Sequence, residues 1–242
     1  MKTEVWAHRG ASGYAPENTL EAFELAVKQN ADGIELDVQL SRDGELVVIH
    51  DETIERVSGI KGNVRDFTLE QLKALNVNRT HTEYHTSRIP ALKEVYELIY
   101  PTGLCINVEL KTGIWFYPGI EEKLIQLTQD MNMQDRVWYS SFNHASALKM
   151  KQLDASSRVG LLYSDGWMNV PEYAENAGAD ALHPMGYNLQ YPGFLEQCRE
   201  RNLKIHVWTI NREEDIRTVA AAGADAIITN YPDRARKVLE EY

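Results

Sequence analysis

The sequence predicts an α/β protein, a closed TIM (β/α)8 barrel with a small insertion after its second strand. Short β-branched or aromatic runs alternate with helix-like runs along most of the chain, which is the pattern of β/α units around a parallel sheet. The strand-like runs also reach the count of a closed barrel. A doubly wound open sheet is the alternative, but no glycine-rich phosphate-binding loop opens a helix after a strand.

The expected barrel strands follow one another at regular intervals. In chain order they cover residues 5–8, 34–38, 106–110, 136–141, 158–163, 181–185, 204–210 and 226–230. Helical runs, several of which end on Gly or Asn as helix C-termini often do, are expected at 19–30, 89–100, 119–131, 144–153, 170–178, 193–202 and 212–223. The chain is therefore predicted to form one barrel domain over residues 1–242.

The segment after the second strand departs from this alternation. Residues 42–51, RDGELVVIHD, join an Asp-Gly hairpin signal to an apolar run, so the chain is expected to return antiparallel to the second strand. A two-residue turn would place His50 opposite Asp37, whereas a bulged three-residue turn would shift the pairing by one. From about 51 to 88 the chain is polar apart from 68–75, and we interpret it as an insertion that borders the site at one barrel mouth.

Composition restricts the partners and the compartment. The formal net charge of -11 disfavours nucleic acid and anionic membrane surfaces, because phosphates need basic patches. No run approaches the roughly 20 apolar residues of a membrane span, and the N-terminus lacks an apolar signal core. We expect a cytoplasmic protein without membrane insertion, in which Cys105 and Cys198 are inert thiols. The sequence leaves the oligomeric state open.

Acidic residues occur at the ends of two expected strands. Side chains alternate along a strand, so Glu35 and Asp37 share one face and Glu109 shares another with Lys111. At the active-site end of a barrel, three inward carboxylates favour one hard divalent cation, calcium or magnesium rather than zinc. The alternative is a structural network with Arg9 and Lys111. An ion held by the three carboxylates, together with these two cations, would make the pocket attractive to an anion.

Two of the histidines stand beside these candidate ligands. His8 ends the first strand, and His50 is expected to end the returning hairpin strand. If both flank one pocket, one can remove a proton from a nucleophile while the other protonates a leaving alcohol. Trp208 shares a face with His206 and is interpreted first as core filling and second as a ligand contact. The histidines interpreted as structural are His81, His85, His144, His183 and His206.

Five segments together resemble the glycerophosphodiester phosphodiesterase family. They are residues 7–23 (AHRGASGYAPENTLEAF), 33–51 (GIELDVQLSRDGELVVIHD), 107–111 (NVELK), 207–211 (VWTIN) and 225–233 (DAIITNYPD). They follow the family order and span nearly the whole chain. The resemblance implies a TIM-barrel hydrolase that converts glycerophosphodiesters into glycerol 3-phosphate and an alcohol such as choline or ethanolamine.

The resemblance also implies roles for individual residues. His8 would act as general base and His50 as general acid. The residues implied to hold one divalent ion, Ca²⁺ or Mg²⁺, are Glu35, Asp37 and Glu109, and those implied to bind phosphate are Arg9 and Lys111. Asn18 also matches the opening motif, and we interpret it first as the cap of the helix that follows and second as a pocket residue.

Two functions of other classes remain as alternatives. A non-catalytic barrel that binds glycerophosphodiesters would have no need for His8 and His50. A metal-dependent barrel lyase or aldolase acting on a carbon acid would need no pair of histidines beside a phosphate. The sequence therefore favours a small-molecule phosphodiester hydrolase.

Overall fold

The computed structural model describes residues 3–241 and joins the strands into one closed sheet. The strands are β1 (Glu4–His8), β2 (Gly33–Leu40), β3 (Leu46–Val48), β4 (Cys105–Leu110), β5 (Val137–Ser141), β6 (Arg158–Tyr163), β7 (Ala181–Pro184), β8 (Lys204–Val207) and β9 (Ala226–Thr229). Their order is β1-β9-β8-β7-β6-β5-β4-β2-β3, and an additional β1–β2 pairing closes the barrel. All pairings are parallel except that of β3 with β2, so the predicted TIM barrel is confirmed.

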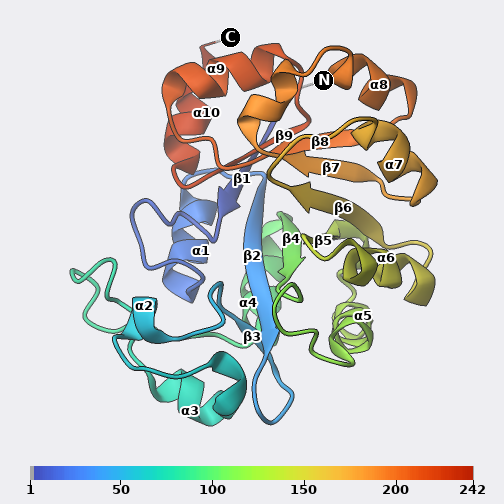
Figure 1. Ribbon diagram of the computed structural model, residues 1–242. Helices are drawn as coiled ribbons and strands as arrows, with labels where there is room; N and C mark the ends of the chain where they lie inside the picture. The colour runs from blue at the N-terminus through green and yellow to red at the C-terminus, as the bar shows by residue number, and fades with distance from the viewer. Residues whose placement is uncertain (1–2, 242) are drawn as a thin grey trace.

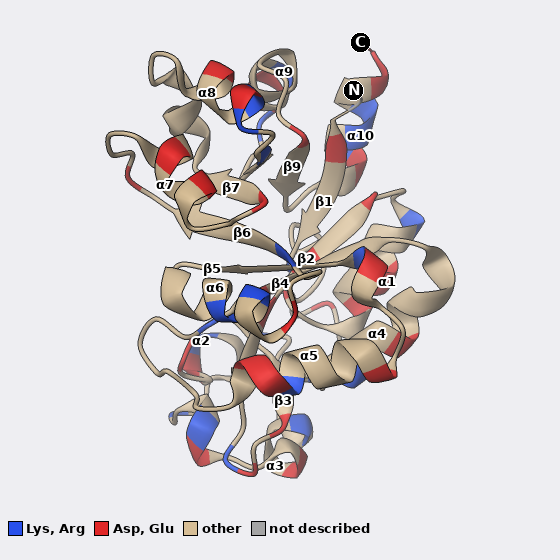
Figure 2. Ribbon diagram, turned by 90° about the vertical axis from the view of Figure 1, so that its right-hand side faces the viewer, with Lys and Arg blue, Asp and Glu red and all other residues tan. Residues whose placement is uncertain are grey.

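Helices surround the barrel (Figure 1). The α-helices are α1 (Leu20–Lys28), α2 (Glu55–Ser58), α3 (Leu69–Ala74), α4 (Leu92–Ile99), α5 (Ile120–Asp130), α6 (His144–Leu153), α7 (Val170–Asn176), α8 (Phe194–Glu200), α9 (Glu213–Ala221) and α10 (Pro232–Glu240). Short 3₁₀ turns are η1 (Val64–Asp66), η2 (Tyr100–Thr102), η3 (Gln134–Arg136) and η4 (Gly186–Gln190). The outer surfaces of the α-helices carry acidic and basic positions close together, as α5 shows (Figure 2). Within residues 3–241, none of the helices combines the length and the apolar character needed to cross a bilayer.

Strand alternation separates the helix layer from the barrel interior. Leu36 and Leu110 are buried in the large hydrophobic cluster that also holds helix residues such as Phe23. Trp6 and Ile228 belong to a different, smaller cluster of inward-facing residues. The acidic residues that alternate with Leu36 and Leu110 therefore point into the barrel.

The β2–β3 hairpin has the shifted register. Val38 pairs with Val48 and Leu40 with Leu46, and the backbone N–H of Ile49 donates to the carbonyl of Asp37 (3.0 Å). The two-residue turn is therefore wrong, because a type I′ turn requires positive φ at both central residues and Gly44 (φ 79°) has it while Asp43 does not. The strand also ends at Val48, before His50.

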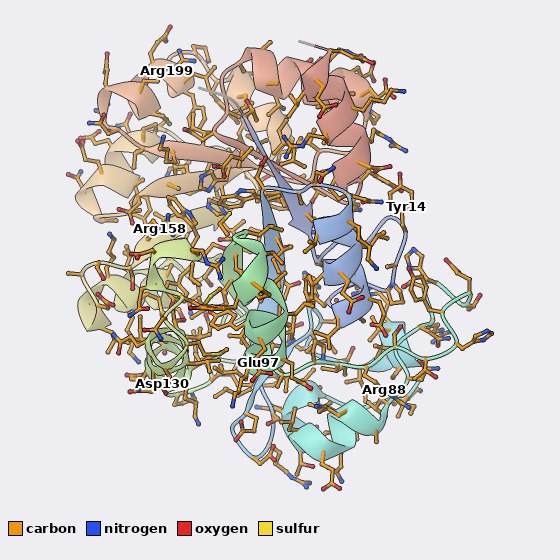
Figure 3. All side chains as sticks on the ribbon, turned by 180° about the vertical axis from the view of Figure 1, so that it is seen from behind. Tyr14, Arg88, Glu97, Asp130, Arg158 and Arg199 are labelled. Atoms are coloured by element: carbon orange, nitrogen blue, oxygen red, sulfur yellow. The ribbon has the colours of Figure 1, made fainter. Side chains whose placement is uncertain are left out.

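The insertion forms a small layer of its own beside the far ends of β2 and β3 (Figure 1). Its α2, η1 and α3 surround a separate hydrophobic cluster that includes Ile54, Val57 and Leu72. In Figure 3, Tyr14 of the β1–α1 loop and Arg88 at the end of the insertion lie on the same side of the molecule. The insertion thus stands next to the loop that follows β1.

Both cysteines are free thiols. Burial raises the pKa of Cys105 and of Cys198 to about 12. Because the thiolate is the reactive form of cysteine, neither side chain has the character of a nucleophile near neutral pH.

Candidate active site

A cavity of about 360 Å³ lies at the C-terminal ends of the barrel strands. Its lining residues are His8, Arg9, Glu35, His50, Asn107, Glu109, Phe142, Leu162, Trp208 and Ile228. A larger hollow of about 630 Å³ beside α7 and α8 has no acidic, basic or histidine side chain in its lining. Another, of about 1080 Å³, has charged lining residues such as Glu4, Arg158 and Lys204 but lies at the N-terminal ends of the strands, which is not where barrel active sites form. We therefore locate the candidate active site in the barrel mouth, where most of the residues singled out in the sequence meet.

Three buried carboxylates converge at one side of this cavity. Glu35 and Asp37 come from β2, and Glu109 lies beside Asp37 on β4. One oxygen of each lies within 4.8 Å of the other two. Burial, and then the charges of Asp37 and Glu109, raise the pKa of Glu35 well above its usual range. A cation at the cluster would favour the ionised form of Glu35.

Two cations partly neutralise the carboxylate cluster, and an amide donates a hydrogen bond to it. Arg9 Nε lies 3.3 Å from Asp37 Oδ2, and Lys111 Nζ lies 2.8 Å from Glu109 Oε1. Asn18 donates a hydrogen bond from Nδ2 to Asp37 Oδ2 (2.8 Å). Burial alone would raise the pKa of Asp37, but the charges of Arg9 and Lys111 hold it well below its usual range. The structural pairing considered from the sequence is therefore present.

This pairing leaves one buried oxygen without a hydrogen bond. Asp37 Oδ1 has no hydrogen-bond partner, although Lys111 Nζ lies 3.8 Å away. Glu35 accepts a bond from the backbone N–H of Arg9 (3.0 Å), while its carboxylate lies 4.0 Å from His8 Nε2. Carboxylate oxygens at this spacing are the hard ligands that Ca²⁺ and Mg²⁺ take in proteins. The residues present therefore fit a divalent ion.

Asn18 is not the cap of α1, which corrects the first interpretation of this residue. Thr19 caps the helix, and its hydroxyl accepts from the N–H of Ala22 (3.3 Å). A capping residue needs extended backbone, whereas Asn18 has φ 57°. This left-handed backbone accompanies a buried side chain that bonds Asp37, so Asn18 supports the carboxylate cluster.

A neutral amide fixes the orientation of His8. Its Nδ1 lies 2.7 Å from Asn230 Oδ1, and an amide oxygen can only accept, so Nδ1 carries the proton and Nε2 a lone pair. Burial, followed by the charge of Arg9, lowers the pKa of His8 to about 4. The backbone N–H of Asn230 in turn donates to Asn211 Oδ1 (2.9 Å). We did not predict Asn230 as a site residue, although it follows the last strand directly.

His50 has a charged partner instead. Its Nδ1 lies 2.7 Å from Asp51 Oδ1, which leaves Nε2 for the cavity. The hydrogen bond from His50, and then the contact with Arg56, lower the pKa of Asp51 well below its usual range. His8 and His50 thus line one cavity with partners of different charge.

Aromatic and aliphatic side chains form the opposite side of the cavity. The ring of Phe142 meets that of Trp208 edge-on, with centroids 5.5 Å apart. Trp208 donates from its indole N–H to the carbonyl of His183 (2.7 Å), so its ring is fixed while one face lines the cavity. Trp208 therefore combines the two interpretations, as packing residue and as cavity wall.

The remaining histidines lie outside the cavity. His183 and His206 are buried deeper in the barrel, where His206 Nδ1 is 2.9 Å from His183 Nε2 and Trp6 packs against both rings. His144, at the start of α6, hydrogen-bonds through Nε2 to the carbonyl of Leu162 (2.8 Å). The last two, His81 and His85, belong to the insertion.

Comparison with known proteins agrees with this geometry. Residues 8–234 match the model of the glycerophosphoryl diester phosphodiesterase family. A glycerophosphodiester phosphodiesterase of Caldanaerobacter subterraneus subsp. tengcongensis is 46% identical over 234 residues, which are 96% of each chain. One of Bacillus altitudinis is 39% identical over 99% of each chain. A phosphodiesterase of Oleispira antarctica, solved with its product sn-glycerol-3-phosphate, superposes with a TM-score of 0.85 at 29% identity, covering 99% of this chain and 97% of that one.

Proposed function

Since the chain belongs to the glycerophosphoryl diester phosphodiesterase family and is a glycerophosphodiester phosphodiesterase, we propose that its reaction depends on a divalent ion and on two histidines. The products would be glycerol 3-phosphate and an alcohol, in line with the product bound to the Oleispira antarctica relative. Membership in this family disfavours both the non-catalytic barrel and the carbon-acid lyase.

Glu35, Asp37 and Glu109 would hold the ion, which we propose to be Ca²⁺ or Mg²⁺. When bound, the ion would supply Lewis-acid stabilisation of the phosphoryl oxygens. The observation that supports it is the buried carboxylate cluster, in which Asp37 Oδ1 has no hydrogen-bond partner. Arg9 and Lys111, which adjoin the carboxylates, would contact the substrate's phosphate and stabilise its developing charge.

The hydrogen-bond partners of the histidines support their division of labour. His8, with Nδ1–H held by the neutral Asn230, presents the lone pair of Nε2 and would take the proton of the nucleophile. His50, next to the carboxylate of Asp51, would carry a proton on Nε2 and give it to the departing alcohol. Trp208 would pack against the glycerol carbons. The observation that carries this function is the convergence of both histidines and the carboxylates on one cavity.

A substrate with an activated leaving group tests this assignment. A nitrophenyl phosphodiester leaves as a phenolate that is stable near neutral pH and needs no proton. Loss of a positioned acid or base costs about 10²- to 10⁴-fold. We therefore expect His50→Ala to lose this factor on glycerophosphocholine but to keep much more relative activity on the nitrophenyl ester. His8→Ala should be equally poor on both substrates in parallel steady-state assays.

His85→Ala is the matched control, because His85 is an exposed histidine of the insertion. It should behave as the wild type on both substrates, and circular dichroism should show all variants folded. Rescue of His8→Ala instead would reverse the two roles. Equal losses for both variants on both substrates would contradict the acid/base assignment.

A further inference from the structure

A continuous chain of ion pairs links the insertion to two residues that line the cavity, Arg9 and His50. Its centre is Arg56, on α2, which lies 39 residues from Glu17 in the sequence. Glu17 belongs to the β1–α1 loop and contacts Arg9, and Asp51 follows His50 directly. The order of contacts is therefore Arg9, Glu17, Arg56, Asp51, His50.

Arg56 contacts both oxygens of each carboxylate. Its Nη1 and Nη2 lie 2.7 and 2.8 Å from the oxygens of Glu17. Its Nε and Nη2 lie 2.6 and 3.1 Å from those of Asp51. A guanidinium has a rigid fork of donors that can serve two carboxylates at once, whereas a lysine ammonium is a single charged point.

Each of the two carboxylates also bonds a residue that lines the cavity. Glu17 Oε1 accepts from Arg9 Nη1 (2.9 Å), and Asp51 Oδ1 accepts from His50 Nδ1 (2.7 Å). Burial alone would raise the pKa of Glu17, but the hydrogen bonds and charges of Arg56 and Arg9 lower it. Glu17 therefore stays ionised between the two arginines.

The insertion holds the backbone around Arg56 in place. The neighbouring Ile54 and Val57 are buried in the hydrophobic cluster of the insertion, so the backbone of α2 is anchored on both sides of Arg56. His50, by contrast, lies beyond the end of β3 and has no strand pairing to orient it. Gln39 Nε2 holds the backbone carbonyls of His50 and Asp51 (3.1 and 2.8 Å), and Asp51 holds the imidazole ring through Nδ1.

We propose that Arg56 is a positioning residue that orients His50 through Asp51 and Arg9 through Glu17. This inference rests on the proposed function, because it assigns Arg56 to the machinery of the same reaction. It also gives the insertion a role: α2 supplies the guanidinium that connects the acid to the phosphate contact. Arg56 itself does not line the cavity.

The proposal predicts a defect that depends on the leaving group. A displacement of about 1 Å in a catalytic group costs about 10²-fold, so Arg56→Ala should lower kcat on glycerophosphocholine by roughly 10- to 100-fold. On the nitrophenyl diester, which needs no acid, the loss in kcat should be several-fold smaller. KM should rise on both substrates because Glu17 would no longer be held against Arg9. Arg56→Lys should recover only part of the activity.

Two further variants each change one carboxylate partner of Arg56, so they separate the effect on kcat from that on KM. They also test the proposal if Arg56→Ala fails to fold. Asp51→Asn should reproduce the leaving-group dependence of kcat, and Glu17→Gln should mainly raise KM. Arg79→Ala is the matched control, because Arg79 belongs to the same insertion and its side chain bonds the backbone carbonyl of Glu55 (3.2 Å) rather than Glu17 or Asp51. It should leave both parameters unchanged.

The outcomes distinguish this inference from the proposed function. One outcome overturns the positioning role and leaves the proposed function standing. In it, His50→Ala shows the leaving-group dependence, whereas Arg56→Ala and Asp51→Asn either lose activity equally on both substrates or lose none. If His50→Ala itself shows no such dependence, the acid assignment fails first. Leaving-group dependence in all three variants supports the inference.

Discussion

The two sides of the catalytic cavity are built on different principles. The polar side comes from β1, β2, β4 and the segment after β3, and the apolar side from the ends of β5, β6, β8 and β9. The polar residues are His8, Arg9, Glu35, His50, Asn107 and Glu109, and the apolar residues are Phe142, Leu162, Trp208 and Ile228. The barrel thus places charged and polar groups on one side of the cavity and apolar groups on the other.

The two sides differ in the support that they need. Buried charged groups require partners, and those of the polar side come from segments outside the barrel and include Asn18, Glu17 and Arg56. The apolar side depends on packing between Phe142 and Trp208 and on one hydrogen bond from the Trp208 indole to the carbonyl of His183. A change on the polar side should therefore affect catalysis strongly, and one on the apolar side should affect mainly binding.

Removal of the metal or of a ligand should have the largest effect. Lewis-acid stabilisation contributes several kcal/mol, so chelation, Glu35→Ala or Glu109→Ala should each lower kcat by at least about 10³-fold. The barrel should remain folded, because the apolar clusters are untouched. Steady-state assays with chelator and with added Ca²⁺ or Mg²⁺ measure this effect.

Asp135→Ala provides the control, since Asp135 is an exposed acid on η3 before β5, away from the strand ends that form the mouth. Its activity should match that of the wild type. Full activity in excess chelator, once metal analysis confirms that the ion is gone, would rule out the metal site.

A buried histidine deeper in the barrel should control acid stability. Burial lowers the pKa of His206 from 6.5 to about 3, so the folded protein keeps it neutral while the unfolded chain takes up a proton below pH 6.5. The stabilisation is fully present above pH 6.5 and is lost as the pH falls from 6.5 towards 3. The loss of stability amounts to about 1.4 kcal/mol for each pH unit below 6.5. In a protein of this length, each kcal/mol corresponds to roughly 2–4 °C in Tm.

His206→Phe keeps an aromatic ring against Trp6 and Trp138 but cannot titrate. Thermal melts between pH 7 and 4 should therefore show a shallower fall in Tm for this variant than for the wild type, while His85→Asn should follow the wild type. Parallel curves for His206→Phe and wild type would show that the acid sensitivity arises elsewhere, for example in the carboxylate cluster.

Truncation of the apolar side should have the smallest effect. Aromatic contacts are worth about 0.5–1.5 kcal/mol beyond their buried area, so Trp208→Leu should raise KM for glycerophosphocholine by about tenfold and leave kcat within about threefold. Phe116→Ala is the control, because Phe116 is exposed on the β4–α5 loop and does not line the cavity. A large loss of kcat at constant KM would mean that the apolar side acts in the transition state.

The sequence alone determined the features that follow from local periodicity. The β/α alternation predicted the barrel, and the two-residue period of strands predicted that Glu35, Asp37 and Glu109 would face inward together. Both predictions hold because backbone geometry sets these periods without reference to distant residues. The segments that resemble the family supplied the expected chemistry.

Only the tertiary structure decided the contacts between segments. The hairpin register depended on the backbone at Asp43, and the cap of α1 depended on the orientation that Asn18 takes toward Asp37. Asn230 reaches His8 across 222 residues of sequence, and Arg56 reaches Glu17 across 39. Such pairs arise when the barrel closes and brings the ends of distant strands together, so no local pattern in the sequence specifies them.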